Sequence, residues 1–249
     1  MNIEITGSPV FTTLPILGGI PITATLVVTW GIMLLLTVFC IWLTHDLRVN
    51  HVTTRQTIAE FLVNTAQNFV DSNMGPRFSH YAPFIAAIFS LSLLSSLSGL
   101  LGLFSPTADL STELGWAVLV FVLITATKIK TNGIGGYLKG YTQPIAVLTP
   151  FNIISEIATP ISMAFRHFGN IVSGTVISTL IYAALGTASH ALFGLLPGAV
   201  GDLLSRIPFL SVGIPAVFSL YFDWFSSFMQ AFIFCMLTMM YIAAAAEAD

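Results

Sequence analysis

The amino-acid sequence predicts an all-α membrane protein with five transmembrane helices and one amphipathic helix at the membrane interface. Of its 249 residues, 55% are hydrophobic and only 8% are charged, whereas a soluble domain carries about 25% charged residues. The mean hydropathy is +0.90. This composition excludes an ordinary soluble enzyme and a disordered chain. Because lipid offers the backbone no hydrogen bonds, the spans are expected to be helical.

Five apolar stretches are long enough to cross a bilayer, which takes about 20 helical residues. We expect a single integral membrane domain over residues 1–249, with an outer leader at residues 1–21. The spans are expected at residues 22–44, 80–104, 112–130, 150–186 and 207–246. The last two stretches exceed the length of a perpendicular span, so we expect them to form a long, strongly tilted hairpin.

Residues 53–71 differ from these spans because polar and apolar side chains are mixed along them. The apolar positions recur at helical spacing and are Ile58, Phe61, Leu62, Ala66, Phe69 and Val70. Interspersed among them are Arg55, Gln56, Glu60, Gln67 and Asp71. This pattern predicts an amphipathic helix that lies in the interface.

The basic residues predict the orientation of the chain, because cytoplasmic loops are rich in Lys and Arg. Two loops on one side contain six of the eight bases, namely Arg48, Arg55, Arg77, Lys128, Lys130 and Lys139. The second loop, with Asp109 and Glu113, has none, and the fourth has only Arg206. We therefore expect a multi-pass protein with its N-terminus outside and its C-terminus in the cytoplasm.

One base remains within an apolar stretch, and this base is Arg166. An arginine at the centre of a span costs at least about 2.5–3.5 kcal/mol on insertion scales, so such residues mark functional sites. A guanidinium keeps its proton, so it holds a fixed positive charge and cannot relay protons. Ser162, Asn170 and Ser173 share its helix face and extend it into a polar stripe.

Two carboxylates flank this arginine along the predicted helices. Asp223, Ser227 and Gln230 form a second stripe on the last helix, with Gln230 about 10 Å deeper than Asp223. We expect Asp223 in the outer half of the membrane and Glu156 towards the cytoplasm, where carboxylates can pass protons from each face. Neither is well placed to neutralise Arg166, so we infer that its counter-charge comes from another chain.

Three other interpretations of these charges are open. Arg166 could form a structural ion pair with Asp223 or Glu156 that stabilises the bundle. It could instead bind an anionic substrate in a secondary transporter, although the sequence shows no internal repeat of the kind that such folds usually contain. The chain could also be a purely structural membrane scaffold.

The remaining candidates are weaker. We expect His167 to be a packed or interfacial residue, because it points about 100° away from Arg166, and His190 to lie near the outer end. The sequence has no phosphate loop, nucleophile triad or metal-ligand spacing and no nucleic-acid footprint. We therefore expect no cofactor, no metal and no nucleic-acid partner.

Three sequence motifs resemble those of subunit a of the F-type ATP synthase. The first is TPFN at residues 149–152, followed by Glu156, Pro160, Ser162 and RHFGN at residues 166–170. The second is KIKTNGIGGY at residues 128–137, which is similar to the cytoplasmic loop of bacterial members. The third is QAFIF at residues 230–234, followed by Leu237-Thr238 and Tyr241-Ile242. The resemblance covers the chain from about Thr53 onward.

This resemblance implies a stator subunit that provides two offset proton half-channels to a rotating c-ring. Arg166 would match the arginine that faces the rotor carboxylate, with Gln230 and Asn170 beside it. Asp223 would line the outer half-channel and Glu156 the inner one. Further half-channel candidates are Ser162, Ser173, Ser227, Thr175 and His190. Because Thr175 stands where some bacterial members have a carboxylate, Asp223 would carry the outer relay alone.

The resemblance also implies the partners and location of the chain. The partners would be the c-ring subunits, the b subunits of the peripheral stalk, the rest of the F-type ATP synthase and the lipid bilayer. The chain would lie in a bacterial plasma membrane and would be no enzyme on its own, since it has no nucleotide site. The choice between H⁺ and Na⁺ would reside in the binding site of the rotor.

Overall fold

A computed structural model describes residues 8–15, 19–49, 53–143, 145–194 and 209–247 of the chain. This part of the protein is mostly helical, and it contains five helices that are long and apolar enough to cross a membrane. The expected helical membrane class with five candidate spans is therefore confirmed. Two short strands add to it: β1 (Val10–Leu14) and β2 (Ile20–Thr23) pair antiparallel ahead of the first helix.

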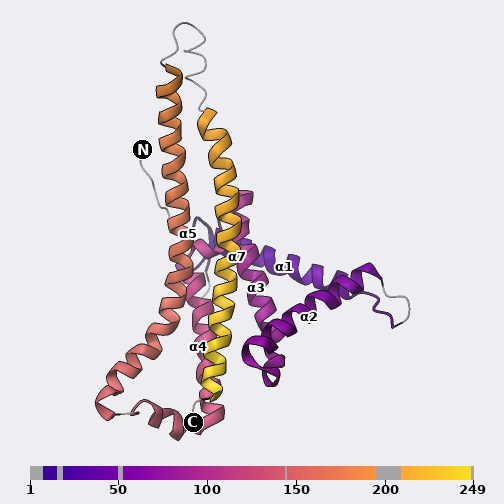
Figure 1. The fold of residues 1–249 in the computed structure, drawn as a ribbon, viewed down its shortest axis with the longest axis vertical. Helices are drawn as coiled ribbons and strands as arrows, with labels where there is room; N and C mark the ends of the chain where they lie inside the picture. Colours follow the sequence, from indigo (N-terminus) through magenta and orange to yellow (C-terminus); the bar gives the residue numbers. More distant parts are fainter. Residues whose placement is uncertain (1–7, 16–18, 50–52, 144, 195–208, 248–249) are drawn as a thin grey trace.

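The first two helices lie to one side of the molecule (Figure 1). They are α1 (Ala24–Thr44) and α2 (Thr54–Met74), and each begins after a threonine whose side chain accepts a hydrogen bond from a backbone amide of the first turn. Thr23 caps α1 and Thr53 caps α2 in this way. Such caps satisfy amide groups that have no partner within the helix. The two helices therefore start where the sequence offers a capping side chain.

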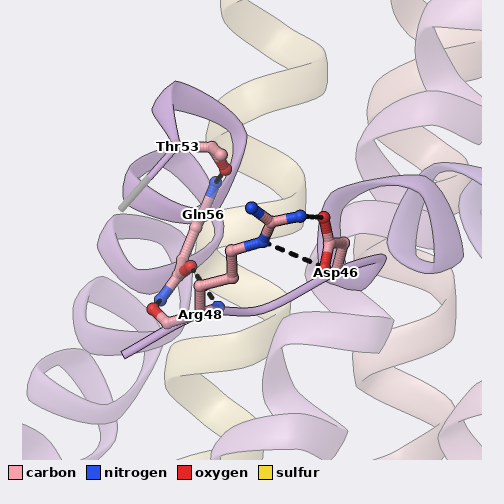
Figure 2. Close-up of polar contacts among 4 residues, drawn as sticks. All are labelled: Asp46, Arg48, Thr53 and Gln56. Atoms are coloured by element: carbon pink, nitrogen blue, oxygen red, sulfur yellow. Dashed lines mark hydrogen bonds and ion pairs between the residues drawn. The ribbon is translucent and has the colours of Figure 1, made fainter. Parts of the chain in front are cut away.

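The connection between α1 and α2 is held by hydrogen bonds (Figure 2). The side chain of Gln56 accepts a hydrogen bond from the backbone amide of Arg48 and donates one to the backbone carbonyl oxygen of Arg48, both at 3.0 Å. The guanidinium of Arg48 donates to both carboxylate oxygens of Asp46, and this hydrogen bonding lowers the pKa of the Asp46 carboxyl. Asp46 itself has a φ of 64°, a left-handed conformation in which aspartate is enriched.

Two further helices, α3 and α4, follow α2 along the chain. α3 (Ala82–Leu97) follows the 3₁₀ helix η1 (Pro76–Tyr81) and is followed by η2 (Ser98–Leu101) and η3 (Pro106–Ala108). The helical stretch formed by α3 and η2 ends at Leu101, before the expected residue 104, and the chain turns at Gly102, where φ is 73°. α4 (Leu110–Gly140) is longer than the expected span at residues 112–130 and has a kink at Gly133, where φ is 69°.

The last two helices are the longest and lie side by side (Figure 1). After the short η4 (Ala146–Leu148), α5 runs over Thr149–Gly194, and α7 runs over Phe209–Glu247. α5 therefore continues past the expected residue 186. The hydrophobic core lies where α2, α3 and α4 pack against this pair, and its fully buried members include Val70, Val120, Met239 and Ile242.

Polar contacts tie together segments that are distant in the sequence. At the start of α1, the hydroxyl of Thr25 donates to the carboxylate of Asp109, which precedes α4, at 2.9 Å. Near the end of α7, Glu247 lies 3.4 Å from the guanidinium of Arg77 in η1. The beginnings of α1 and α4 thus share one end of the bundle, and η1 shares the other end with the C-terminal part of α7.

Candidate functional site

The polar stripe on α5 lies on an exposed side of the helix. Ser162, Arg166, Asn170 and Ser173 are all exposed. The opposite face carries the residues that hold α5 in place, since Ala164 is fully buried and His167 is only 1% exposed. A helix of 3.6 residues per turn separates these two sets. The packing of α5 therefore directs Arg166 outwards.

Arg166 makes no ion pair with a carboxylate within the part of the chain that the structure describes. The two acids considered as partners lie elsewhere: Glu156 pairs with Lys128 at 2.9 Å, and Asp223 lines a cavity that does not include Arg166. The central feature of the site is therefore an exposed guanidinium in an apolar helix that has no carboxylate partner among the described residues.

One cavity of about 610 Å³ lies beyond Arg166 towards the end of α5. It brings together four of the candidate residues, Asn170 and Ser173 from α5 with Asp223 and Ser227 from α7. The segment around η2 closes the cavity on the α3 side, where Ser96 and Ser105 add hydroxyl groups. Hydroxyl, amide and carboxyl groups around one space can hold water and pass protons between them.

A second cavity, of about 600 Å³, lies at the beginning of α5. Its polar lining includes Glu156, whose carboxylate accepts hydrogen bonds from Lys128 at 2.9 Å and from the Tyr137 hydroxyl at 3.3 Å. The hydroxyl groups of Tyr137 and Tyr141 are 2.5 Å apart. Burial is the main factor that raises the pKa of Tyr141, with hydrogen bonding adding to it. Glu156 thus places a hydrogen-bonded carboxylate in a cavity that two tyrosines also line.

The polar stripe on α7 faces inwards rather than outwards. Ser227 is 3% exposed and Gln230 is 5% exposed, whereas Asp223 is only partly buried. Because the three residues lie at i, i+4 and i+7, they share one face of the helix. This face brings the Asp223 carboxyl to the cavity that Asn170 and Ser173 line from the other helix.

Some predicted site residues are not brought together. Ser162 and Arg166 line neither cavity, and His190 is exposed near the end of α5. The side chain of Thr175 lies outside the described residues. Among the described residues, no cluster of three or more His, Cys, Asp or Glu side chains offers a metal site.

The grouping of Glu113 with the second loop is wrong, whereas the span expected at residues 112–130 includes this residue. Glu113 belongs to the first turn of α4, and its side chain is fully buried. His167, expected to be a packed or interfacial residue, is a packed one, and its Nδ1 atom lies 3.2 Å from Oε2 of Glu113. The sequence contained one signal for this contact, since both residues border or interrupt apolar runs. The pairing itself depends on how α4 and α5 pack.

The fold and the site define a class of protein: a multi-pass helical membrane protein with an arginine that has no carboxylate partner among the described residues and lies between two cavities that each contain a carboxylate. The family model described as "ATP synthase A chain" matches residues 26–243. The chain therefore belongs to the ATP synthase subunit a family, whose members are membrane subunits of the ATP synthase complex.

Relatives from several bacteria agree with this family. ATP synthase subunit a of Desulforamulus reducens is 33% identical over 224 residues, which cover 88% of this chain and 79% of the relative. The relative from Legionella pneumophila (strain Paris) is 30% identical over 233 residues, which cover 93% of this chain and 90% of the relative. A subunit a from Propionigenium modestum, described as sodium ion specific, is 31% identical over 240 residues, which cover 90% of this chain and 74% of the relative.

Proposed function

We propose that this chain is the stator subunit of the membrane sector of an F-type ATP synthase. It provides two offset proton half-channels to a ring of c subunits and so couples ion flow to rotation. The observation that supports this most strongly is the pair of cavities on either side of Arg166 along α5. Each cavity contains one carboxylate, Asp223 in one and Glu156 in the other.

The outer half-channel is the cavity lined by Asp223, Asn170, Ser173 and Ser227. A carboxylate can take a proton from water and release it again, and the neighbouring hydroxyl and amide groups can orient the water molecules that carry it. The inner half-channel is the cavity lined by Glu156. Glu156 lies ten residues before Arg166, which corresponds to about 15 Å along a helix, so the two routes are offset.

Arg166 keeps the two half-channels apart. Its permanent charge repels a proton on any direct path between the cavities and attracts an empty carboxylate of the rotor. The exposure of Arg166 at the surface of α5 suits this role, because the carboxylate that it meets belongs to another chain. Asn170 and Gln230 supply neutral amides that can hydrogen bond to the guanidinium without cancelling its charge.

This separation converts an ion gradient into rotation. A proton that enters by the outer half-channel neutralises a rotor carboxylate, and the ring must turn through lipid before the proton reaches the inner half-channel. A membrane potential of 100 mV supplies about 2.3 kcal/mol per charge. In this account the chain binds no nucleotide and has no enzymatic activity of its own.

The lengths of α5 and α7 support a strongly tilted hairpin. With 46 and 39 residues, they extend about 69 Å and 58 Å, whereas the hydrocarbon core is about 30 Å thick. Helices of this length fit the bilayer only if they run obliquely through it. A tilted hairpin would also present a long face to the curved side of a rotor.

The surface of α2 supports a position at the membrane interface. Its apolar residues Ile58, Phe61 and Leu62 are 44%, 68% and 46% exposed, so this helix leaves an apolar face for lipid. We place the N-terminus outside and the C-terminus in the cytoplasm of a bacterial plasma membrane. In this orientation α1 and α2 lie beside the hairpin, where b subunits of the peripheral stalk can reach them.

The experiment that tests this function replaces Arg166 in the assembled enzyme. We expect Arg166→Ala to abolish ATP-driven proton pumping in inverted membrane vesicles when the amount of enzyme is equal by immunoblot. The matched control is Arg77→Ala, since Arg77 is an exposed arginine paired with Glu247, and pumping should persist. Proton pumping retained by Arg166→Ala would refute the proposed stator function.

A further inference from the structure

Glu113 and His167 form a buried acid–base pair in the centre of the bundle. Glu113 comes from α4 and His167 from α5, and their side chains are 0% and 2% exposed. The Nδ1 and Oε2 atoms are 3.2 Å apart. The ring of His167 also contacts Trp116 of α4 and Phe234 of α7, with ring centroids 6.4 Å and 6.0 Å apart. Three helices therefore meet at this histidine.

Within the described residues, each of the two side chains has the other as its nearest ionisable partner. Neither carboxyl oxygen of Glu113 and neither ring nitrogen of His167 makes a hydrogen bond within the described part of the chain. A net charge without a partner is costly in such an environment. The pair avoids a net charge when it holds one proton between the carboxyl group and the imidazole. Removal of either member leaves the other isolated in an apolar core.

His167 and Arg166 are neighbours on one helix and share its rotation. Because successive helical residues are about 100° apart, burial of His167 sends the side chain of Arg166 to the exposed face. A rotation of α5 that released His167 from Glu113 would also turn Arg166 and Asn170. Interdigitated apolar side chains already hold α5 in one rotational position, and the pair adds to this because a rotation that separated its two members would leave each of them without a partner in the core.

We propose that Glu113 and His167 are positioning residues for ion translocation, because their contact fixes the rotation of α5 and hence the direction of Arg166. This inference rests on the proposed function of Arg166 and adds a residue pair that acts through it. The pair touches neither the outer nor the inner cavity, so it acts on the arginine and not on the proton path.

The first test measures ATP-driven proton pumping per assembled enzyme in inverted vesicles. We expect Glu113→Ala and His167→Ala each to lower pumping by about tenfold or more, as small misplacements of a functional group do. Combining Glu113→His with His167→Glu should restore pumping to within about twofold, because the two coupled groups are both present again. The control Glu247→Gln, at an exposed acid, should leave pumping unchanged.

The second test reports the rotation of α5 directly. In a Cys40→Ser background, Ser162→Cys or Ala164→Cys is combined with one cysteine in the rotor subunit beside its membrane carboxylate. Ser162 is exposed and Ala164 is fully buried, so disulfide formation should favour position 162. Adding Glu113→Ala should reduce this preference. A merely stabilising pair would reduce the amount of enzyme without changing the preference.

These outcomes separate the inference from the function on which it rests. If Arg166→Ala abolishes pumping but both alanine variants of the pair pump normally, the inference fails and the stator function stands. An unchanged cross-linking preference in Glu113→Ala, or failure of the exchanged pair to restore pumping, would also overturn it. If Arg166→Ala pumps normally, the proposed function fails and the inference fails with it.

Discussion

Arg166 and His167 are consecutive residues of α5 with opposite environments. The side chain of Arg166 is exposed and has no carboxylate partner within the described part of the chain, whereas His167 is buried 3.2 Å from Glu113. Membership in the ATP synthase subunit a family gives this contrast a meaning. In the function that we propose, Arg166 has to reach a partner outside its own chain, and the packing of the buried face of α5 has to hold it in that direction.

Replacement of Asp223 should slow proton uptake from the outer side. Asp223→Asn keeps the size and polarity of the side chain but removes the group that takes up a proton, so we expect ATP synthesis driven by a proton gradient to fall about 100-fold. The measurement is the initial rate of synthesis in reconstituted vesicles. Asp46→Asn is the control, since Asp46 is exposed in the α1–α2 connection. Equal rates for both variants would contradict an outer relay at Asp223.

Replacement of Glu156 should impair the inner half-channel without disrupting its structure. Glu156→Gln can still accept hydrogen bonds from Lys128 and Tyr137 but can no longer exchange a proton, so we expect ATP-driven pumping to fall about tenfold or more at normal enzyme levels. Pumping in inverted vesicles and an immunoblot of the subunit check this prediction.

Removal of the lysine partner of Glu156 should act differently from removal of the acid. Lys128→Met leaves the carboxylate of Glu156 without its ion pair in a mostly buried position, which should lower the stability and the amount of the subunit. Lys130→Met is the matched control, because Lys130 is exposed and has no ion pair within the described residues. If Lys128→Met and Lys130→Met accumulate equally, the pair adds little to stability.

Gln56 should slow the hydrogen exchange of the Arg48 amide in the connection between α1 and α2. Gln56→Ala removes both hydrogen bonds to the backbone of Arg48 (Figure 2), each worth about 0.5–1.5 kcal/mol. We expect the Arg48 amide to exchange its hydrogen about tenfold faster or more, as measured by hydrogen–deuterium exchange of the solubilised complex. The control Gln67→Ala lies at an exposed position of the same helix. Unchanged exchange at Arg48 would show that other contacts hold this connection.

Composition and helical periodicity were enough to predict the membrane class, the five candidate spans and the position of the charges along them. These features depend on composition and periodicity, which are local properties that any helix in lipid must satisfy. The stripe from Ser162 to Ser173 was predictable for the same reason, since helical spacing alone puts these residues on one face. The β1–β2 hairpin was not predicted, because its short strands are stabilised by pairing with each other.

Which side chains lie close together depends on how the helices pack. Glu113 and His167 come from different helices, and so do Asp223 and Asn170, which line one cavity, so the proximity of each pair depends on the rotation and packing of α4, α5 and α7. The sequence places a charge along a helix axis but not against a neighbouring helix. Packing buries His167, joins the two carboxylates to separate cavities and leaves Arg166 on the surface, because a helix can bury only one of its faces against the bundle.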